Sequence, residues 1–505
     1  MSKLTVIIFG VQPHSPHFET QLDVMQQHLD EGDHVIYVDC DRAVMMCDAS
    51  TSNDPLFCRG CVAKRKGGLR LLTPVVQTVL LSSLIPADEE IAPHPPLAFD
   101  TSETLGSFRF DDWDCGEAVL SSLYSITKTR YPSFDTYQDF IQRGLHATIR
   151  LYRAARAAIR RFHPDRVYFF NGRGVGGRCF VRACQAEKVR FFSHERGSRN
   201  DSFLLLENAI IQDPDAWQQD IVRCWNNNPD DAQKCQIADV FFQNRRQGKN
   251  LRYIRINFLK DQVKGIVPEG WWQADPRLVL FTSSETEHAA LSGFFDKGIY
   301  NDLADALNRI VGDLTARGFL GQLVVRMHPN SASEAHSILA QFAHHHAPFL
   351  RMVLPWDQVD TYSLLDNASK VIVANSTLGM EAAYIGKPVI LLNRAIYDKL
   401  GAVYTPHNHE ELMEMLQLDL PPLDRTGTYH FGYHGMSFGQ PLHHTHMKGT
   451  NKCSFKGQKI RSPWHLDQIL KLKRHRPWLE HLLEKTLYPF LSGYRQVNLK
   501  KEQGK

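Results

Sequence analysis

The chain has 505 residues, of which 43% are hydrophobic and 22% charged, and its formal net charge is +3. These values are typical of a globular protein with two core-forming domains of about 200 residues or more, and the charge is too small to require nucleic acid as a partner. Ten cysteines are too few for a disulfide scaffold, and no apolar run approaches the roughly 18 residues that span a bilayer. Because the first ten residues lack the pattern of a secretory signal, we expect a cytoplasmic protein.

Short apolar runs alternate with helical periodicity through the first half of the chain. Strands are expected at residues 4–9, 34–39, 167–171 and 189–193, with helices at 18–29, 140–161 and 178–188. This alternation is typical of a parallel sheet covered by helices. We therefore predict a doubly wound domain over residues 1–265.

The same pattern starts again after residue 265. Strands are expected at 278–281, 323–327, 349–354, 371–373 and 389–392, and a helix is expected to end at Gly318. The fold class predicted is therefore α/β, with a second domain over residues 266–465. Residues 466–505 are basic and rich in aromatic side chains. They are expected to form helices that pack back on the first domain, and the alternative is contact with an anionic membrane surface.

Hydroxyl, cationic and acidic side chains follow several strands of the predicted second sheet. Ser376 and Thr377 come after one strand and open a short helix that contains Glu381. Hydroxyls and free N–H groups at a helix start can hold a phosphate, and a carboxylate one turn further can reach a ribose. The alternative is that Ser376 only caps the helix. Other strand ends carry further candidates, namely Ser283, Ser284, Arg326, His328, Pro329 and Asn375.

These segments resemble the GT-B glycosyltransferases of bacterial surface polysaccharide assembly, especially the capsule-synthesis type. The resemblance lies in the Arg-x-His-Pro run at 326–329 and in the stretches 376–383 and 386–389. It implies two Rossmann-like domains facing a cleft and a nucleotide-sugar donor bound by the second domain. It also implies donor phosphate contacts from His328, Ser376 and Thr377, and a ribose contact from Glu381. Because Val389 stands where many retaining members carry a second acid, we expect inversion.

An inverting transferase needs a base that takes the proton of the acceptor hydroxyl. Glu195, just after the strand expected at 189–193, is the first candidate, and His17, Glu19 and His14 are the reserves. The acceptor is expected beside the glycine-rich loop of residues 172–177, at Asn171, Arg173 and Gly174. Each of these residues has the alternative of being a solvated loop position.

The same glycine-rich loop also fits a dinucleotide-binding fingerprint. It follows a strand, precedes a helix and has Glu195 about 20 residues downstream. An NAD-dependent enzyme is therefore an alternative, although it would leave the strand-end motifs of the second domain without a role.

Four thiols lie within a short segment at Cys40, Cys47, Cys58 and Cys61. A C-x-x-C pair with two further cysteines can hold a tetrahedral structural zinc, and unligated thiols are the alternative. For catalysis we expect no metal.

The sequence thus predicts a metal-independent transferase that moves a sugar from a nucleotide donor to a surface polysaccharide or lipid-linked glycan. The alternatives are a sugar-nucleotide epimerase of the same fold and a non-catalytic partner of polysaccharide assembly. The carrier nucleotide stays open among CMP, UDP and GDP. Peripheral contact with the inner face of the cytoplasmic membrane through the basic tail is a further expectation.

Overall fold

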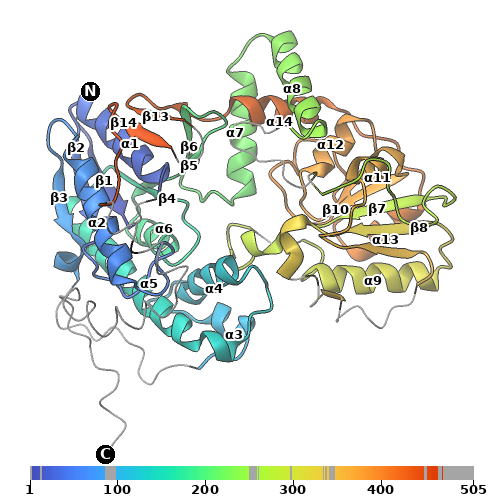
Figure 1. Cartoon of the computed structure of the whole chain (residues 1–505), viewed down its shortest axis with the longest axis horizontal. Coiled ribbons are helices and arrows are strands. Elements are labelled where there is room, and N and C mark those ends of the chain that lie inside the picture. The colour runs from blue at the N-terminus through green and yellow to red at the C-terminus, as the bar shows by residue number, and fades with distance from the viewer. Residues whose placement is uncertain are drawn as a thin grey trace, which may run out of the picture.

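Two parallel sheets, each covered by helices on both faces, lie in separate halves of the molecule (Figure 1). The computed structural model describes residues 3–11, 14–85, 98–249, 261–295, 298–333, 347–448 and 452–463, together with residues 259, 335, 338, 339 and 469. The predicted fold class, with two doubly wound Rossmann-like domains, is confirmed. The predicted helices of residues 466–505 lie outside the described part of the chain, apart from residue 469.

The first sheet has, within the described residues, the strand order β12-β6-β5-β4-β1-β2-β3. Strands β1 to β5 run parallel, whereas β6 and β12 are antiparallel additions at one edge. The strands are β1 (Thr5–Gly10), β2 (His34–Asp39), β3 (Gln77–Leu80), β4 (Arg166–Phe170), β5 (Arg190–Arg196), β6 (Ser202–Glu207) and β12 (Gln440–Pro441). The four strands predicted for this half are confirmed.

Helices cover both faces of this sheet because its strands are apolar on both sides. Ile7 and Phe9 of β1 pack towards the helices α4 to α6, whereas Val6 and Ile8 pack towards α1 and α2. The helices of this half are α1 (His17–Asp30), α2 (Pro55–Leu69), the 3-10 turn η1 (Leu81–Leu84), α3 (Ser102–Ser107), α4 (Cys115–Thr127), α5 (Phe134–Phe162) and α6 (Arg178–Ala186).

The second sheet is parallel throughout and has the order β11-β10-β7-β8-β9. Its strands are β7 (Arg277–Phe281), β8 (Gln322–Arg326), β9 (Leu350–Val353), β10 (Lys370–Val373) and β11 (Val389–Leu391). All five were predicted. Around them lie η2 (Glu285–Glu287), α9 (Leu303–Ala316), η3 (Pro329–Ser331), α11 (Thr361–Asn367), α12 (Leu378–Tyr384) and α13 (His409–Gln417).

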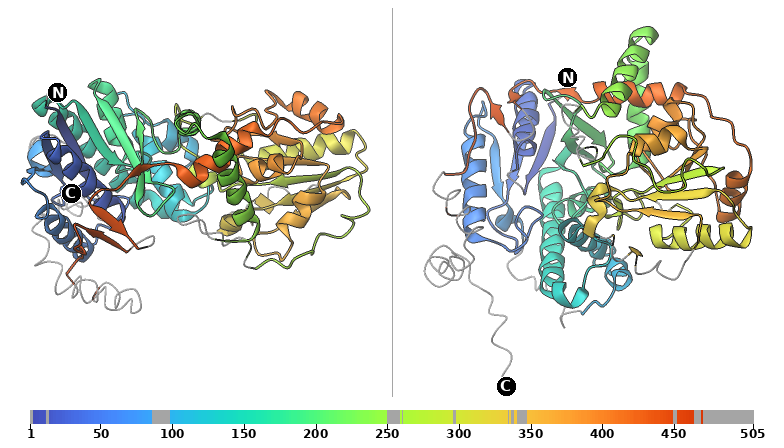
Figure 2. Two further views of the ribbon diagram at one scale, coloured as in Figure 1. Left: turned by 90° about the horizontal axis from the view of Figure 1, so that it is seen from above. Right: turned by 45° about the vertical axis from the view of Figure 1, so that its right-hand side comes forward.

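Three helices lie between the two sheets, as Figures 1 and 2 show. They are α7 (Pro214–Asn226), α8 (Asp231–Arg246) and α14 (Thr426–Ser437). Helix α8 packs on α14, and its Phe242 stacks on Tyr384 of α12 with ring centroids 4.1 Å apart. Although α8 precedes residue 265, it therefore packs with the second half.

After α14 the chain returns to the first sheet. Strand β12 pairs with β6, and the ribbon of β13 (Thr445–Met447) and β14 (Cys453–Phe455) lies on α1. The carboxylate of Asp23 on α1 accepts the backbone N–H groups of His443, His444 and Thr445 at 3.1, 2.9 and 2.6 Å. The return therefore begins well before residue 465, where the sequence pattern suggested the end of the second domain. Within the described part of the chain, no helix combines the length and apolarity needed to cross a bilayer.

Candidate functional site

The two sheets each have one point where the strand order reverses. In the second sheet this point lies between β7 and β10, and in the first it lies between β1 and β4. Open α/β sheets bind ligands beyond the carboxyl ends of the strands at such points, because the connecting loops diverge there and leave a crevice. Residues that follow β7, β10, β1 and β4 are therefore the main candidates for ligand binding.

Hydrogen bonds at the end of β7 draw three predicted segments together. The hydroxyl of Ser283 accepts the backbone N–H of Asn375, after β10, at 3.2 Å. The hydroxyl of Thr282 accepts the backbone N–H of His328, after β8, at 2.9 Å. The strand-end motifs of β7, β8 and β10 therefore meet at one edge of the sheet, as the sequence predicts.

A pocket opens at this edge and reaches the first domain. Ser283 and Asn375, which are predicted to bind the donor, line it. Arg130, from the segment between α4 and α5, lies in its wall and pairs with Glu285 at 3.4 Å. Sequence reasoning missed this arginine because its nearness to β7 depends on how the two domains meet. It also missed other lining residues, including His288, Tyr300 and Asn393.

His288 contributes a neutral imidazole to this pocket. Burial, assisted by the charge of Arg173, lowers the pKa of His288 to about 4. Its Nδ1 atom is buried and has no hydrogen-bond partner among the described residues, and its ring stacks on Phe295 with centroids 4.7 Å apart. At neutral pH this side chain can therefore accept or donate a hydrogen bond without carrying charge.

Other predicted donor residues have structural partners of their own. The guanidinium of Arg326 is only 4% exposed and donates to the backbone carbonyls of Leu354 and Asp357 at 2.7 and 3.3 Å. Burial and the neighbouring Arg326 both lower the pKa of His328. Ser284 shares a hydrogen bond with Thr286, and Pro329 opens the turn η3. Arg326 thus fixes the loop after β9 in this conformation.

Glu381 lies in a buried polar cluster. Its Oε1 accepts from Nε of Arg245 at 2.7 Å, and its Oε2 accepts from the hydroxyl of Tyr362 at 2.7 Å. Arg245 also donates to the hydroxyl of Thr377 at 3.0 Å, while the hydroxyl of Ser376 accepts the N–H of Leu378 at 3.3 Å. The ribose and phosphate contacts predicted for these residues stay predictions. A ribose that bound Glu381 would contact a carboxylate that already accepts a hydrogen bond from Arg245.

The reversal point of the first sheet gathers His17, Asn171 and Glu195. The ring of His17 lies 4.0 Å from that of Phe170, centroid to centroid, and its Nε2 lies 3.5 Å from Oε1 of Glu195. Asn171 donates to Oε2 of Glu195 at 3.4 Å. Three of the residues predicted for acceptor binding and catalysis therefore lie together.

Burial sets the protonation of this cluster. It raises the pKa of Glu195, which remains 26% exposed at its side chain. It lowers the pKa of His17 well below its ordinary value, helped by the neighbouring His194 and Arg196. A carboxylate with a raised pKa beside a neutral imidazole is suited to proton transfer near neutral pH.

Glu19 lies further into α1 and is only 1% exposed. Its Oε1 accepts from the hydroxyl of Ser15 at 2.7 Å and pairs with Nζ of Lys64 at 3.2 Å. The burial of Glu19 makes it a structural partner of α2 in this conformation rather than a group facing solvent.

The glycine-rich loop approaches protein atoms closely. The backbone N–H of Val175 donates to Ser122 at 2.9 Å, and that of Gly176 donates to Asp48 at 2.8 Å. A Cβ atom at Gly174 would lie 2.5 Å from the hydroxyl oxygen of Ser122. The glycines are therefore explained by packing, and two N–H groups that a dinucleotide phosphate would need are already bonded.

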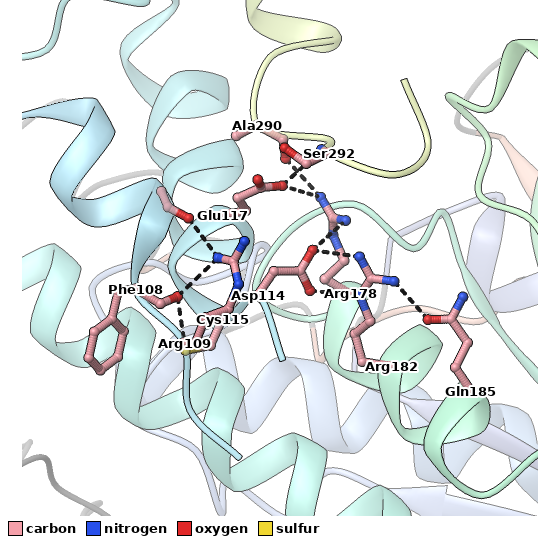
Figure 3. Close-up of polar contacts among 11 residues, drawn as sticks. Phe108, Arg109, Asp114, Cys115, Glu117, Arg178, Arg182, Gln185, Ala290 and Ser292 are labelled. Atoms are coloured by element: carbon pink, nitrogen blue, oxygen red, sulfur yellow. Dashed lines mark hydrogen bonds and ion pairs between the residues drawn. The ribbon is translucent and has the colours of Figure 1, made fainter. Parts of the chain in front are cut away.

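The loop after β7 binds the first domain through a buried charge cluster, drawn in Figure 3. Arg178 of α6, fully buried, pairs with Asp114 at 3.0 Å and Glu117 at 3.4 Å and donates to the carbonyl of Ala290 at 2.8 Å. Glu117 also accepts the N–H of Ser292 at 2.9 Å. Arg173 donates to the carbonyl of Glu287 at 2.9 Å. The strand end that carries Ser283 is thus held against the first domain.

The four predicted metal ligands, Cys40, Cys47, Cys58 and Cys61, line a separate cavity beside β2 and α2.

Comparisons with known proteins found one family model and a set of solved structures that are similar to this chain. No curated protein matches the chain. Two solved structures of KpsC from Thermosulfurimonas dismutans are similar. The beta Kdo 2,4 transferase is 14% identical over 54% of this chain and 79% of that chain, with a TM-score of 0.33. The beta Kdo 2,7 transferase is 12% identical over 64% and 89%, with the same TM-score.

A UDP-GlcNAc 2-epimerase from Methanocaldococcus jannaschii is 10% identical over 86% of this chain and 98% of that chain, with a TM-score of 0.29. The match of the family model described as capsule polysaccharide biosynthesis protein spans residues 301–417, from the start of α9 to the end of α13. The resemblance predicted from the strand-end motifs is therefore confirmed, since this segment of the second domain matches the model of that family.

Proposed function

We propose that this protein is a glycosyltransferase of surface polysaccharide assembly. It moves a sugar from a nucleotide donor, bound at the reversal point of the second sheet, to a glycan or lipid-linked acceptor at the reversal point of the first. The observation that carries this proposal is the contact between the two points, since the loop after β7 binds Arg173 and Arg178 of the first domain. The match to a capsule biosynthesis family supports the substrate class.

The donor occupies the pocket lined by Ser283, Asn375 and Arg130. Arg130 supplies a cation that stabilises the phosphate of the leaving nucleotide, and the serine and asparagine donate hydrogen bonds to it. Charge stabilisation by these groups makes a catalytic metal unnecessary in this proposal. Sugar transfer that persists in the presence of a metal chelator would support the proposal that no catalytic metal is needed.

Transfer proceeds with inversion. The acceptor hydroxyl oxygen attacks the anomeric carbon, and the bond from that carbon to the donor phosphate breaks with its electron pair on the phosphate oxygen. The carboxylate of Glu195 takes the hydroxyl proton, because its raised pKa makes it a stronger base than an exposed carboxylate. Asn171 and His17 hold Glu195 in position.

Replacing Glu195 by Gln tests the base. Glu195→Gln should lower the rate of sugar transfer by about 10²-fold or more, because a general base contributes that much, while the affinity for the donor nucleotide stays unchanged. Purified protein would be incubated with CMP-, UDP- and GDP-sugars and a glycan primer, and released nucleotide and extended glycan would be measured together.

Glu207→Gln is the matched control, since this exposed glutamate lies on the neighbouring strand β6 and pairs with Arg190 at the surface. It should retain full transfer. Undiminished turnover in Glu195→Gln would remove this residue from the role of base. Conversion of the donor into an epimer without an acceptor would replace the transferase proposal with an epimerase.

A further inference from the structure

His288 lines the donor pocket but has no part in the transfer steps described above. It follows η2 on the loop after β7, and it is partly buried. Its ring stacks on Phe295, which packs against the core of the first domain. His288 therefore lies in the wall of the pocket that the first domain supports.

The first domain approaches His288 through Arg173. The guanidinium of Arg173 donates to the backbone carbonyl of Glu287 at 2.9 Å, and its charge helps to lower the pKa of His288. Ser283 and Asn375, in contrast, lie beyond the ends of β7 and β10, where the donor phosphate is proposed to bind. A sugar that extends from that phosphate towards the acceptor side therefore passes the wall that carries His288.

The two ring nitrogens of His288 have different surroundings. Nδ1 is buried and lacks a hydrogen-bond partner within the described part of the chain, whereas Nε2 is open to the pocket that the ring lines. Because burial lowers the pKa of His288 to about 4, the ring carries a single proton at neutral pH. A buried N–H group without an acceptor is rarer in proteins than a buried acceptor without a donor. The proton therefore belongs on Nε2, which can donate a hydrogen bond to an oxygen atom in the pocket.

The backbone next to His288 is strained and is held by the first domain. Ala290 has a φ of 58°, in the left-handed region that residues with a Cβ atom seldom adopt. Its carbonyl accepts from Arg178 at 2.8 Å, and the N–H of Ser292 donates to Glu117 at 2.9 Å (Figure 3). Such strain persists only where surrounding contacts enforce it, and it concentrates at binding and catalytic sites. The loop is thus fixed in the conformation that presents His288 to the pocket.

We propose that His288 binds the transferred sugar of the donor, with Nε2–H donating a hydrogen bond to one of the oxygen atoms of that sugar. This inference rests on the proposed function and adds to it a residue that distinguishes a nucleotide-sugar from its free nucleotide. Arg130, Ser283 and Asn375 bind the phosphate that both ligands share, whereas His288 contacts only the sugar.

Binding measurements on the full chain test this proposal. The nucleotide-sugar that the wild-type protein uses in the transfer assay, and its free nucleotide, would each be titrated by calorimetry into the wild type and into His288→Phe. Phenylalanine keeps a ring that can stack on Phe295 and removes the N–H donor. The variant should bind the nucleotide-sugar about fivefold to tenfold more weakly, which corresponds to the loss of one neutral hydrogen bond. It should bind the free nucleotide as the wild type does.

His146→Phe is the matched control. His146 lies on α5 and does not line the donor pocket. Like His288, it is partly buried, its Nδ1 has no hydrogen-bond partner among the residues that the structure describes, and burial lowers its pKa. The control variant should bind both ligands as the wild type does. His288→Gln should recover part of the lost affinity, because the side-chain amide of glutamine can donate a hydrogen bond in place of Nε2.

The pattern of affinities separates the possible outcomes. Equal weakening of both ligands in His288→Phe would show that the residue only shapes the pocket, and this result would overturn the proposal. Unchanged affinity for both ligands would overturn it as well. Either result leaves the proposed function intact, since the wild type still transfers sugar. A wild-type protein that transfers sugar from none of the CMP-, UDP- and GDP-sugars would instead contradict the proposed function, and this inference with it.

Discussion

Glu381 illustrates how a residue can be located from the sequence while its partners cannot. The apolar strand and the residues before it place Glu381 at the start of a helix, and the structure has it there, in α12. Its partner Arg245 lies 136 positions earlier, on α8. Hydrophobic periodicity reports only local structure, so this ion pair could not be predicted.

The Arg245–Glu381 pair should contribute strongly to stability because both groups are buried. Glu381→Gln removes the carboxylate that pairs with Arg245, and breaking a buried pair by removing one partner costs about 3–5 kcal/mol. Urea unfolding of the variant should show a correspondingly lower free energy of unfolding.

Asp366→Asn is the control, since Asp366 pairs at 2.6 Å with Arg246, the next residue on α8, and both side chains are at least one-third exposed. Exposed pairs contribute about 1 kcal/mol or less. If the two variants lose equal stability, the pair of Glu381 and Arg245 is not the buried charge pair that the geometry indicates.

His194 makes the first domain sensitive to acid. It is 1% exposed, both ring nitrogens lack hydrogen-bond partners within the part of the chain that the structure describes, and burial lowers its pKa to about 3. Between that value and the unfolded pKa of about 6.5, the unfolded chain binds a proton that the folded chain does not. Stability is therefore lost as the pH falls below about 6.5.

His194→Phe should reduce this loss. Between pH 7.5 and pH 5, one such histidine costs about 2 kcal/mol, so the variant should show that much less change in its free energy of unfolding. The raised pKa of Glu195 acts in the opposite direction. A carboxyl that binds a proton more tightly in the folded protein than in the unfolded chain makes the folded protein more stable as the pH falls.

Ser193→Ala is the control for this pH effect. Ser193 lies next to His194 on β5, and its hydroxyl, which does not titrate, donates to the carbonyl of Ala209 at 2.7 Å. The variant removes this hydroxyl. It should lower stability equally at both pH values. An unchanged pH dependence in His194→Phe would contradict the assignment to His194.

Several elements with strong patterns were predicted, although β6, whose residues Ser202–Glu207 form a largely buried apolar run, was not. The central strands β1, β4, β7 and β10 are apolar on both faces, and that uniform signal fixed their positions and hence both reversal points. Strand β3 was not found because three of its four residues are exposed. The strands β12, β13 and β14 are only 2 or 3 residues long, too short for any period to show.

The glycine-rich loop shows a different limit of prediction. Its glycines indicate a close approach of the backbone to something, and the structure confirms a close approach. The atoms approached are those of Ser122 and Asp48, which come from distant segments. A glycine pattern alone therefore does not distinguish a ligand from the protein's own side chains.

The whole molecule depends on the segment after β7 to join its halves. Leu291 belongs by sequence to the second half, yet it is 2% exposed and packs in the core of the first. Together with the Arg178 cluster (Figure 3) it holds the pocket lined by Ser283 and Asn375 against the first domain. The sequence predicted two domains facing a cleft from a resemblance, but the residues that connect them could not be predicted, because their partners lie in the other domain.

Leu291→Ala tests this connection. The cavity left behind should lower the stability of the first domain by about 2–5 kcal/mol, because the leucine packs in that core. Hydrogen exchange should therefore become faster in β1 and β4, while β8, in a different core, should change little. Leu320→Ala, at a position 92% exposed, should leave exchange in both sheets unchanged. Equal acceleration in the two sheets, or none in the first, would show that the segment does not belong to the first core, and the donor pocket would then lose its anchor on the acceptor domain.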